Sequence, residues 1–172
     1  VVVDIETTGG NNSYNRITEI GMVKLVGGKE VDRFQTLLNP QRRIPSSITR
    51  LTGISDDMVA DAPLFAEVAD HIASFTEDAV FVAHNVNFDY GFIKQEFARL
   101  EQPFRRPKMC TVREMRRTHP GLSSYSLANL TKHFHIDMEQ HHRALSDAKA
   151  AAELLKLAFE KDDEGFSVGD NV

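Results

Sequence analysis

The pattern of apolar and polar residues indicates strands in the first quarter of the chain. Residues 1–5 form a short run rich in valine and isoleucine, which is typical of a buried strand. Residues 16–26 alternate apolar and polar side chains, and residues 29–38 follow after the turn formers Gly27 and Gly28. This arrangement predicts an antiparallel hairpin next to the first strand.

The rest of the chain alternates helical patterns with short apolar runs. Apolar residues recur every three or four positions in the longer segments, whereas two runs are only long enough for strands. Three strands followed by alternating strands and helices predict an α/β domain with a mixed sheet. Helices are expected at 46–51, 55–59, 63–75, 87–100, 126–134 and 144–160, and further strands at 79–83 and 108–112.

The 172 residues are enough for one domain, which we assign to residues 1–160. Residues 161–172 are acidic and contain glycine, so they are expected to form a flexible tail or linker. Cys110 is the single cysteine, which excludes an intramolecular disulfide and predicts a buried structural thiol. No apolar run approaches the ~20 residues that a membrane span requires. The chain opens on three valines without methionine, as expected of a domain cut from a longer protein.

Charge is distributed unevenly along the chain. The net charge is -5, but residues 160–172 hold five acids and one lysine, which leaves the body at -1. Residues 99–117 hold seven basic residues and two acids. Such a run is most often a solvated surface, and the alternative is a strip that contacts phosphates.

Two carboxylates stand on one face of the first predicted strand. Successive strand residues point to opposite faces, so Asp4 and Glu6 share the face of Val2. Two buried carboxylates are unfavourable unless a cation compensates them. The alternatives at this point are a site for a divalent cation and a strand end that has already reached solvent.

Two further acids follow in segments that could converge on the same place. Asp89 comes shortly after the strand at 79–83, although it could simply complement the dipole of the next helix. Asp147 shares a helical face with Ala151 and Leu154. His142 is five residues earlier, about 140° around a helix, so we expect it in the approach to that helix. Carboxylate-rich sites suit Mg²⁺ or Mn²⁺.

Three motifs together resemble those of a known enzyme family. The segments at 4–9 (Asp-Ile-Glu-Thr-Thr-Gly), 84–89 (His-Asn-Val-Asn-Phe-Asp) and 142–147 (His-x4-Asp) are similar to the three motifs of the DEDDh, or DnaQ-like, 3'–5' exonucleases. The likeness covers about residues 1–160, and Leu-Thr-Gly-Ile at 51–54 adds to it. It is greatest to the proofreading subunit or domain of bacterial DNA polymerase III.

The resemblance implies a fold and a mechanism. The fold would be ribonuclease H-like, with a five-stranded sheet in the order 3-2-1-4-5 flanked by helices. Two divalent cations, Mg²⁺ or Mn²⁺, would be held by Asp4, Glu6, Asp89 and Asp147, with Asp4 bridging both. His142 would be the general base that deprotonates the attacking water. Nucleoside 5'-monophosphates would be released from the 3' ends of DNA.

The resemblance also implies contacts to the substrate. Large apolar residues usually follow Thr-Thr-Gly in the family, whereas this chain has Gly10, so gripping of the terminal base is expected to be weaker or to use another side chain. Once cations cancel the carboxylates, the basic strip becomes a stronger candidate for phosphate contacts. The residues expected to bind substrate are Thr7, Thr8, Gly9, Thr52, His84, Asn85 and Phe88, with Arg105, Arg106 and Arg113 on phosphates.

Other interpretations remain open at the level of sequence. An exoribonuclease like RNase T or oligoribonuclease would carry the same catalytic residues, and the pair Thr7-Thr8 favours DNA by analogy only. A non-catalytic nucleic-acid-binding module would normally lack a carboxylate. A zinc site could involve His133, His135, His141 and His142, without a cysteine nearby. The chain could act alone, with a DNA polymerase or fused to another domain, and the bacterial cytoplasm is the expected compartment.

Overall fold

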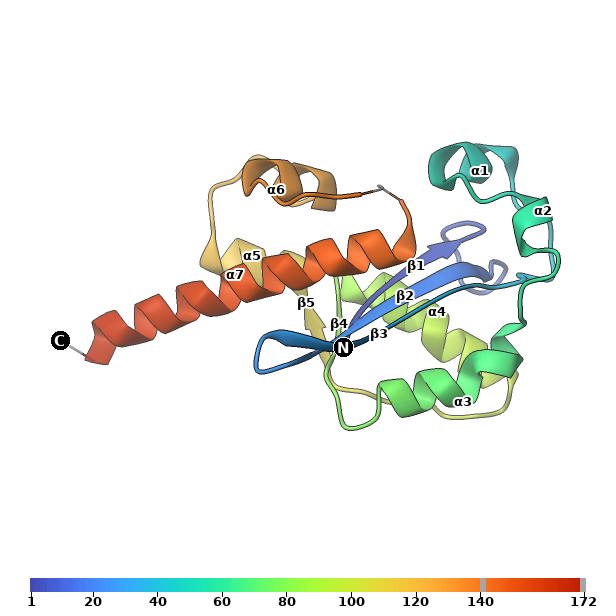
Figure 1. Ribbon diagram of the computed structural model, residues 1–172, viewed down its shortest axis with the longest axis horizontal. Coiled ribbons are helices and arrows are strands. Elements are labelled where there is room, and N and C mark those ends of the chain that lie inside the picture. The colour runs from blue at the N-terminus through green and yellow to red at the C-terminus, as the bar shows by residue number, and fades with distance from the viewer. Residues whose placement is uncertain (140–141, 171–172) are drawn as a thin grey trace.

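The computed structural model describes the chain except residues 140, 141, 171 and 172 and the side chains of residues 164–170. Its centre is a five-stranded sheet in the order β3-β2-β1-β4-β5 (Figure 1). β2 is antiparallel to both of its neighbours, whereas β1, β4 and β5 are parallel. The predicted strand order and mixed sheet are therefore confirmed. The strands are β1 (Val2–Thr7), β2 (Ile17–Val26), β3 (Lys29–Leu37), β4 (Phe81–Ala83) and β5 (Lys108–Cys110).

Helices cover both faces of the sheet (Figure 1). α3 (Phe65–Phe75) and α4 (Val86–Arg99) pack on the face to which Val3 and Ile5 of β1 point. α7 (Ala144–Asp170) packs on the opposite face, against Val2 and Val82. Asp4 and Glu6 therefore point to the α7 side, because they alternate with Val3 and Ile5. α5 (Thr111–Thr118) and α6 (Leu127–His133) pack against α7, and α1 (Ser46–Thr52) and α2 (Asp56–Val59) form a separate corner.

The last helix is longer than the sequence predicts. α7 continues through Asp170, where we expected a helix end at 160 and a flexible tail. Residues 161–170 contain no proline, so nothing removes a helical hydrogen bond there. Arg117 of α5 also holds Asp162 at 2.8 Å. The acidic segment is thus a continuation of the helix up to residue 170.

The segment after β5 also differs from the prediction. The strand ends at Cys110, and a helix, α5, begins at Thr111, where the sequence predicted that the strand continues to residue 112. Only Thr111, Met115 and Thr118 of α5 are buried. Two of these are polar, so the helix carries almost no apolar signal for periodicity to detect. Cys110 itself is half-buried rather than buried.

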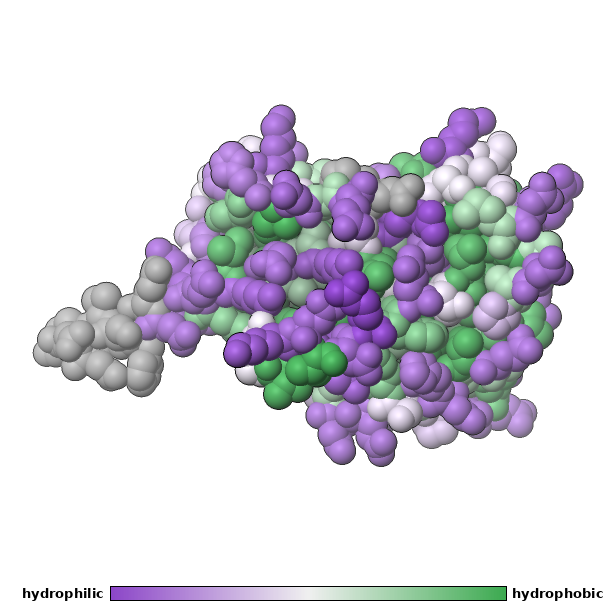
Figure 2. Space-filling view, viewed as in Figure 1, coloured by the Kyte–Doolittle hydropathy of each residue, from purple (hydrophilic) through white to green (hydrophobic). Residues whose placement is uncertain are grey.

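Hydrophilic side chains cover most of one face of the molecule (Figure 2). One of the smaller hydrophobic areas on this face lies over the β2–β3 hairpin, where Val26 and Val31 are exposed (Figure 2). Among the described residues, no helix combines the length and apolar character needed to cross a membrane.

Candidate active site

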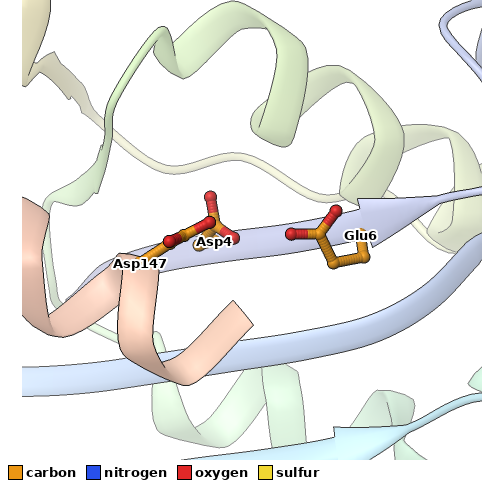
Figure 3. Close-up of side chains that lie close together, drawn as sticks. All are labelled: Asp4, Glu6 and Asp147. Atoms are coloured by element: carbon orange, nitrogen blue, oxygen red, sulfur yellow. The ribbon is translucent and has the colours of Figure 1, made fainter. Parts of the chain in front are cut away.

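Three carboxylates from distant parts of the chain meet at the end of β1. Asp4 and Glu6 come from β1 and Asp147 from the first turn of α7, and they point toward one another (Figure 3). Each offers an oxygen that lies within 4.8 Å of those of the other two. Oδ2 of Asp4 and Oδ1 of Asp147 are buried without a hydrogen-bond partner. The sequence prediction that these carboxylates converge is correct.

Asp89 stands beside this cluster on α4. Ile5 pairs with Ile20 of β2 on one side, but β4 pairs with β1 only at Val2 on the other. The backbone N–H of Ile5 donates to Oδ2 of Asp89 at 3.1 Å instead. Asp89 is buried. Its charge is close enough to raise the pKa of Asp4. The fourth predicted carboxylate therefore belongs to the same electrostatic site, on the α4 side of β1.

Burial raises the pKa of all four carboxyls, and neighbouring negative charges, including that of Glu19, raise it further. Burial raises the pKa of Asp4 well above its ordinary value, and the charges of Asp89, Asp147 and Glu6 raise it further. Burial raises the pKa of Glu6 to about 8 and that of Asp147 to about 7. Burial also raises the pKa of Asp89, against the hydrogen bond from Ile5. Without a cation, the carboxyl groups of the site therefore tend to be protonated and neutral rather than ionised.

The donor set fits a hard divalent cation. All ligand atoms are carboxylate oxygens, which Mg²⁺ and Mn²⁺ prefer. The two unpartnered buried oxygens are atoms that a cation would satisfy, because burial of a polar atom without a partner is costly. No histidine takes part in this cluster, and no other group of candidate ligands occurs among the described residues. The predicted histidine alternative for zinc has no support there, and His141 lies outside the described residues.

A buried ion pair fixes the start of α7 on β2. Oε1 of Glu19 accepts from Nε of Arg143 at 3.0 Å and from the backbone N–H of Ala144 at 2.8 Å. Gly21, on the same face of β2, would place a Cβ only 2.4 Å from the backbone nitrogen of Leu145. Glu19 and Gly21 thus form a seat for the first turn of α7, which carries Asp147. Sequence reasoning missed this seat, although an acid in an otherwise apolar buried strand was a signal.

His142 lies directly before α7, as the sequence predicted. It is exposed, and its φ of 58° places it in the left-handed region. Its backbone N–H donates to the carboxylate of Asp147, which lowers the pKa of that carboxyl. The turn that positions His142 therefore also orients Asp147.

The threonines expected to bind substrate use their hydroxyls within the protein. Thr7 donates to the carbonyl of Gly9 at 2.8 Å, and Thr8 donates to Asn15 at 2.9 Å. Thr52 donates to the carbonyl of Ile48 at 3.0 Å. All three threonines are buried. These side chains shape the loops that surround the site.

The histidine motif after β4 divides into a structural part and an exposed part. Nε2 of His84 lies 2.7 Å from the carbonyl of Tyr125, and Nδ1 lies 2.7 Å from the hydroxyl of Thr111. Asn85 adopts a φ of 74° and is exposed, as is Phe88, whose ring packs on that of Phe92 at 4.9 Å. Asn85 and Phe88 are thus accessible to a substrate, whereas both ring nitrogens of His84 are already bonded.

The basic strip at 99–117 is not a uniform surface. Arg106 donates to the carbonyls of Ala73 and Thr76 at the end of α3, so its guanidinium caps a helix. Arg117 pairs with Asp162 at 2.8 Å, while Arg105 and Arg113 are exposed. The structure therefore leaves the predicted contacts Arg105 and Arg113 accessible but not the guanidinium of Arg106.

The comparisons with known proteins agree with this geometry. A family model described as "Exonuclease" matches residues 1–155. The chain belongs to this exonuclease family. It is 43% identical over 170 residues to a DNA polymerase III PolC-type of Clostridium perfringens, which covers 99% of the chain. The resemblance to DnaQ-like proofreading exonucleases and the assignment as an enzyme are confirmed.

Two further similarities show the range of the exonuclease family. A protein of Mycobacterium tuberculosis named as a bifunctional exonuclease/endonuclease is 41% identical over 94% of the chain. The structure of an Exonuclease X in complex with 5' overhanging duplex DNA is 29% identical and has a TM-score of 0.77, covering 92% of this chain and 89% of that one. The chain spans only 12% of the PolC-type relative and 26% of the mycobacterial protein.

Proposed function

We propose that this exonuclease domain removes nucleotides from the 3' ends of single-stranded or frayed DNA, releasing nucleoside 5'-monophosphates, in proofreading or repair. The observation that carries the proposal is the group formed by Asp4, Glu6 and Asp147, whose oxygens lie within 4.8 Å of one another. Such a group suits a pair of Mg²⁺ or Mn²⁺ ions. When bound, these ions would supply Lewis-acid stabilisation of the charge on the scissile phosphodiester.

Each carboxylate has a distinct part in this proposal. Asp4 lies between the other acids and would be shared by both cations, Glu6 and Asp147 would hold one of them, and Asp89 would support the other. With the cations bound, the phosphate of the scissile bond would lie at this cluster, whose carboxylates alone would repel an anion. His142 would take the proton from the attacking water, a task suited to an imidazole near neutral pH. Its place on the turn before α7 keeps it next to Asp147.

The relatives support DNA as the substrate and a larger protein as the context. The PolC-type relative is a DNA polymerase, and the Exonuclease X structure contains duplex DNA. We propose that the domain works with a polymerase or as part of a fused chain in the bacterial cytoplasm. The exposed Phe88 and Asn85 would contact the terminal nucleotide. The buried Thr7, Thr8 and Thr52 and the half-buried Gly9 would shape its pocket.

One experiment tests polarity, metal use and substrate together. Single-stranded DNA and RNA of the same sequence, labelled at the 5' end, are digested in parallel with Mg²⁺, with Mn²⁺ and with EDTA. We expect a ladder that shortens from the 3' end of DNA, only with a cation. Faster digestion of the RNA would favour the exoribonuclease alternative. Full activity in EDTA, or release of labelled mononucleotide at the start, would contradict the proposal.

A further inference from the structure

A groove free of acidic residues lies beside the carboxylates. It is an open pocket of about 770 Å³ between the junction of β4 and α4, α5 and the loop that precedes α6. Asn85, Arg116, Ser123 and Tyr125 are among its lining residues, and none of the lining residues is an aspartate or glutamate. Next to four carboxylates, such a surface is where an anionic strand meets the least repulsion.

Three donor side chains of the groove, those of Arg116, Ser123 and Asn85, make no hydrogen bond among the described residues. The guanidinium of Arg116 lies 5.5 Å from the centre of the Tyr125 ring, and no described carboxylate pairs with it. Ser123 and Asn85 are exposed, and no hydrogen bond of their side chains occurs among the described residues. The neighbouring Arg117, in contrast, is paired with Glu114 and Asp162. Arg116 therefore offers an uncompensated charge, held against an aromatic ring.

His84 connects two sides of the groove through hydrogen bonds to Thr111 and Tyr125. A carbonyl can only accept, so Nε2 of His84 donates to Tyr125, and in the neutral ring Nδ1 accepts from the hydroxyl of Thr111. Burial lowers the pKa of His84, which favours the neutral ring. The hydroxyl of Tyr125 in turn donates to the carbonyl of His119 at 2.6 Å. The groove is thus a built surface, fixed to the end of β4, rather than a loose loop.

The groove lies close enough to the carboxylates to hold the next phosphodiester of a bound DNA strand. Asn85 is the cap of α4 and Asp89 lies one helical turn later, about 6 Å along the axis. α6 and α1, which carries Thr52, lie on opposite sides of the first turn of α7 (Figure 1). A terminal nucleotide on the α1 side therefore leaves the rest of the strand to run toward α5 and α6.

We propose that this groove binds the phosphodiester on the 5' side of the scissile one, with Arg116 as its main contact and Ser123 and Asn85 as further donors. The proposal rests on the 3'–5' exonuclease function proposed above. Arg113 lies one turn earlier on α5 and is exposed, so it extends the same basic face toward the site. The subsite contacts only the sugar-phosphate backbone of the DNA, so it has no preference for a particular base.

The test compares Arg116→Ala with Arg117→Ala, which removes the same charge from the same helix outside the groove. One substrate is oligothymidylate, and the other is the 4-nitrophenyl ester of thymidine 5'-monophosphate, which lacks a nucleotide on the 5' side. For Arg116→Ala we expect KM for the oligonucleotide to rise about 10-fold and its salt slope to fall by about 0.7. Its kcat and its hydrolysis of the ester should stay as in the wild type. The KM of Arg116→Lys for the oligonucleotide should lie between those of the wild type and of Arg116→Ala.

Three results would overturn the subsite. The first is a KM for the oligonucleotide that Arg116→Ala leaves unchanged. The second is a rise in this KM that is as large in Arg117→Ala as in Arg116→Ala. The third is a loss of ester hydrolysis in Arg116→Ala as large as its loss of activity on the oligonucleotide. Fluorescence anisotropy of a labelled oligonucleotide gives Kd without turnover, and a rise in Kd confined to Arg116→Ala supports the subsite by itself. If the wild type binds in this way but cleaves neither substrate, the exonuclease proposal fails and the binding groove stands.

Discussion

Arg143 and Glu19 are joined across 124 positions of sequence, with Nη2 of the arginine 2.7 Å from Oε2 of the glutamate and Nε 3.0 Å from Oε1. The glutamate is 1% exposed. A paired fork of this kind is directional, because the planar guanidinium matches the carboxylate at two points. It therefore fixes both the place and the rotation of the first turn of α7, and with it Asp147.

We expect Glu19→Gln to reduce kcat by at least about 10-fold while leaving KM for an oligonucleotide unchanged. The amide keeps the shape but loses the charge that holds Arg143, so Asp147 is less well positioned. The free energy of unfolding should fall by about 1.5–3 kcal/mol, the scale of a hydrogen bond to a charged group. Steady-state kinetics and urea unfolding check this. The control is Glu30→Gln, which breaks an exposed pair with Arg33 and should change neither quantity.

Gly21→Ala should impair the enzyme because Gly21, like Glu19, contacts the first turn of α7. A Cβ at this position would lie 2.4 Å from the nitrogen of Leu145, so the first turn of α7 must move. We expect a lower melting temperature and a loss of activity of at least about 10-fold. Gly91→Ala in α4 is the matched control, since its Cβ would meet only the side chain of Asn12, at 3.0 Å. Equal behaviour of the two variants would show that α7 can shift without cost.

Cation binding should stabilise the protein more as the pH rises. Folding raises the pKa of Glu6 to about 8 and of Asp147 to about 7, so the folded metal-free protein binds more protons than the unfolded chain. The stability that these groups contribute therefore falls as the pH rises from about 4, the ordinary pKa of a carboxyl, up to these values. Cations replace the protons, so the difference in melting temperature between Mn²⁺ and EDTA should grow from pH 6 to pH 8. A constant difference would contradict this electrostatic description.

Asp4→Asn should separate stability from catalysis. The substitution removes the buried charge that four neighbouring carboxylates repel, so the melting temperature in EDTA should equal or exceed that of the wild type. The same change removes the carboxylate proposed to be shared by both cations. We expect turnover to fall by about a thousand-fold, the scale of losing a central electrostatic contact. Wild-type hydrolysis by this variant would refute the role of Asp4.

His142→Asn should abolish proton transfer without disturbing the turn. Asparagine tolerates the left-handed conformation of this position, and its backbone N–H can still donate to Asp147. We expect turnover to fall by about 10²–10⁴-fold. The stabilisation by Mn²⁺ should be retained. His141→Asn is the neighbouring control, and if that variant is the impaired one, the general base is His141.

The sequence could predict the carboxylate site because local periodicity places each acid. The alternation in β1 put Asp4 and Glu6 on one face, and the helical repeat put Asp147 on the buried side of α7. Long-range partners are different, because nothing local links Glu19 to Arg143. The same holds for Arg106, which looked like a free charge in the basic strip but caps α3. α5 was missed because packing against α7, rather than apolar periodicity, holds it.

The meeting of β1 with the first turn of α7 has a consequence for how the enzyme is made. During synthesis, Asp4 and Glu6 precede the rest of the sheet, whereas Asp147 emerges only after all five strands have been translated. A ribosome-bound or prematurely terminated chain that lacks α7 therefore holds only part of the carboxylate cluster. Such a chain also leaves Gly21 uncovered and Glu19 without Arg143, because both residues contact the start of α7. The cluster of Asp4, Glu6 and Asp147 is thus assembled only after the first turn of α7 has been translated.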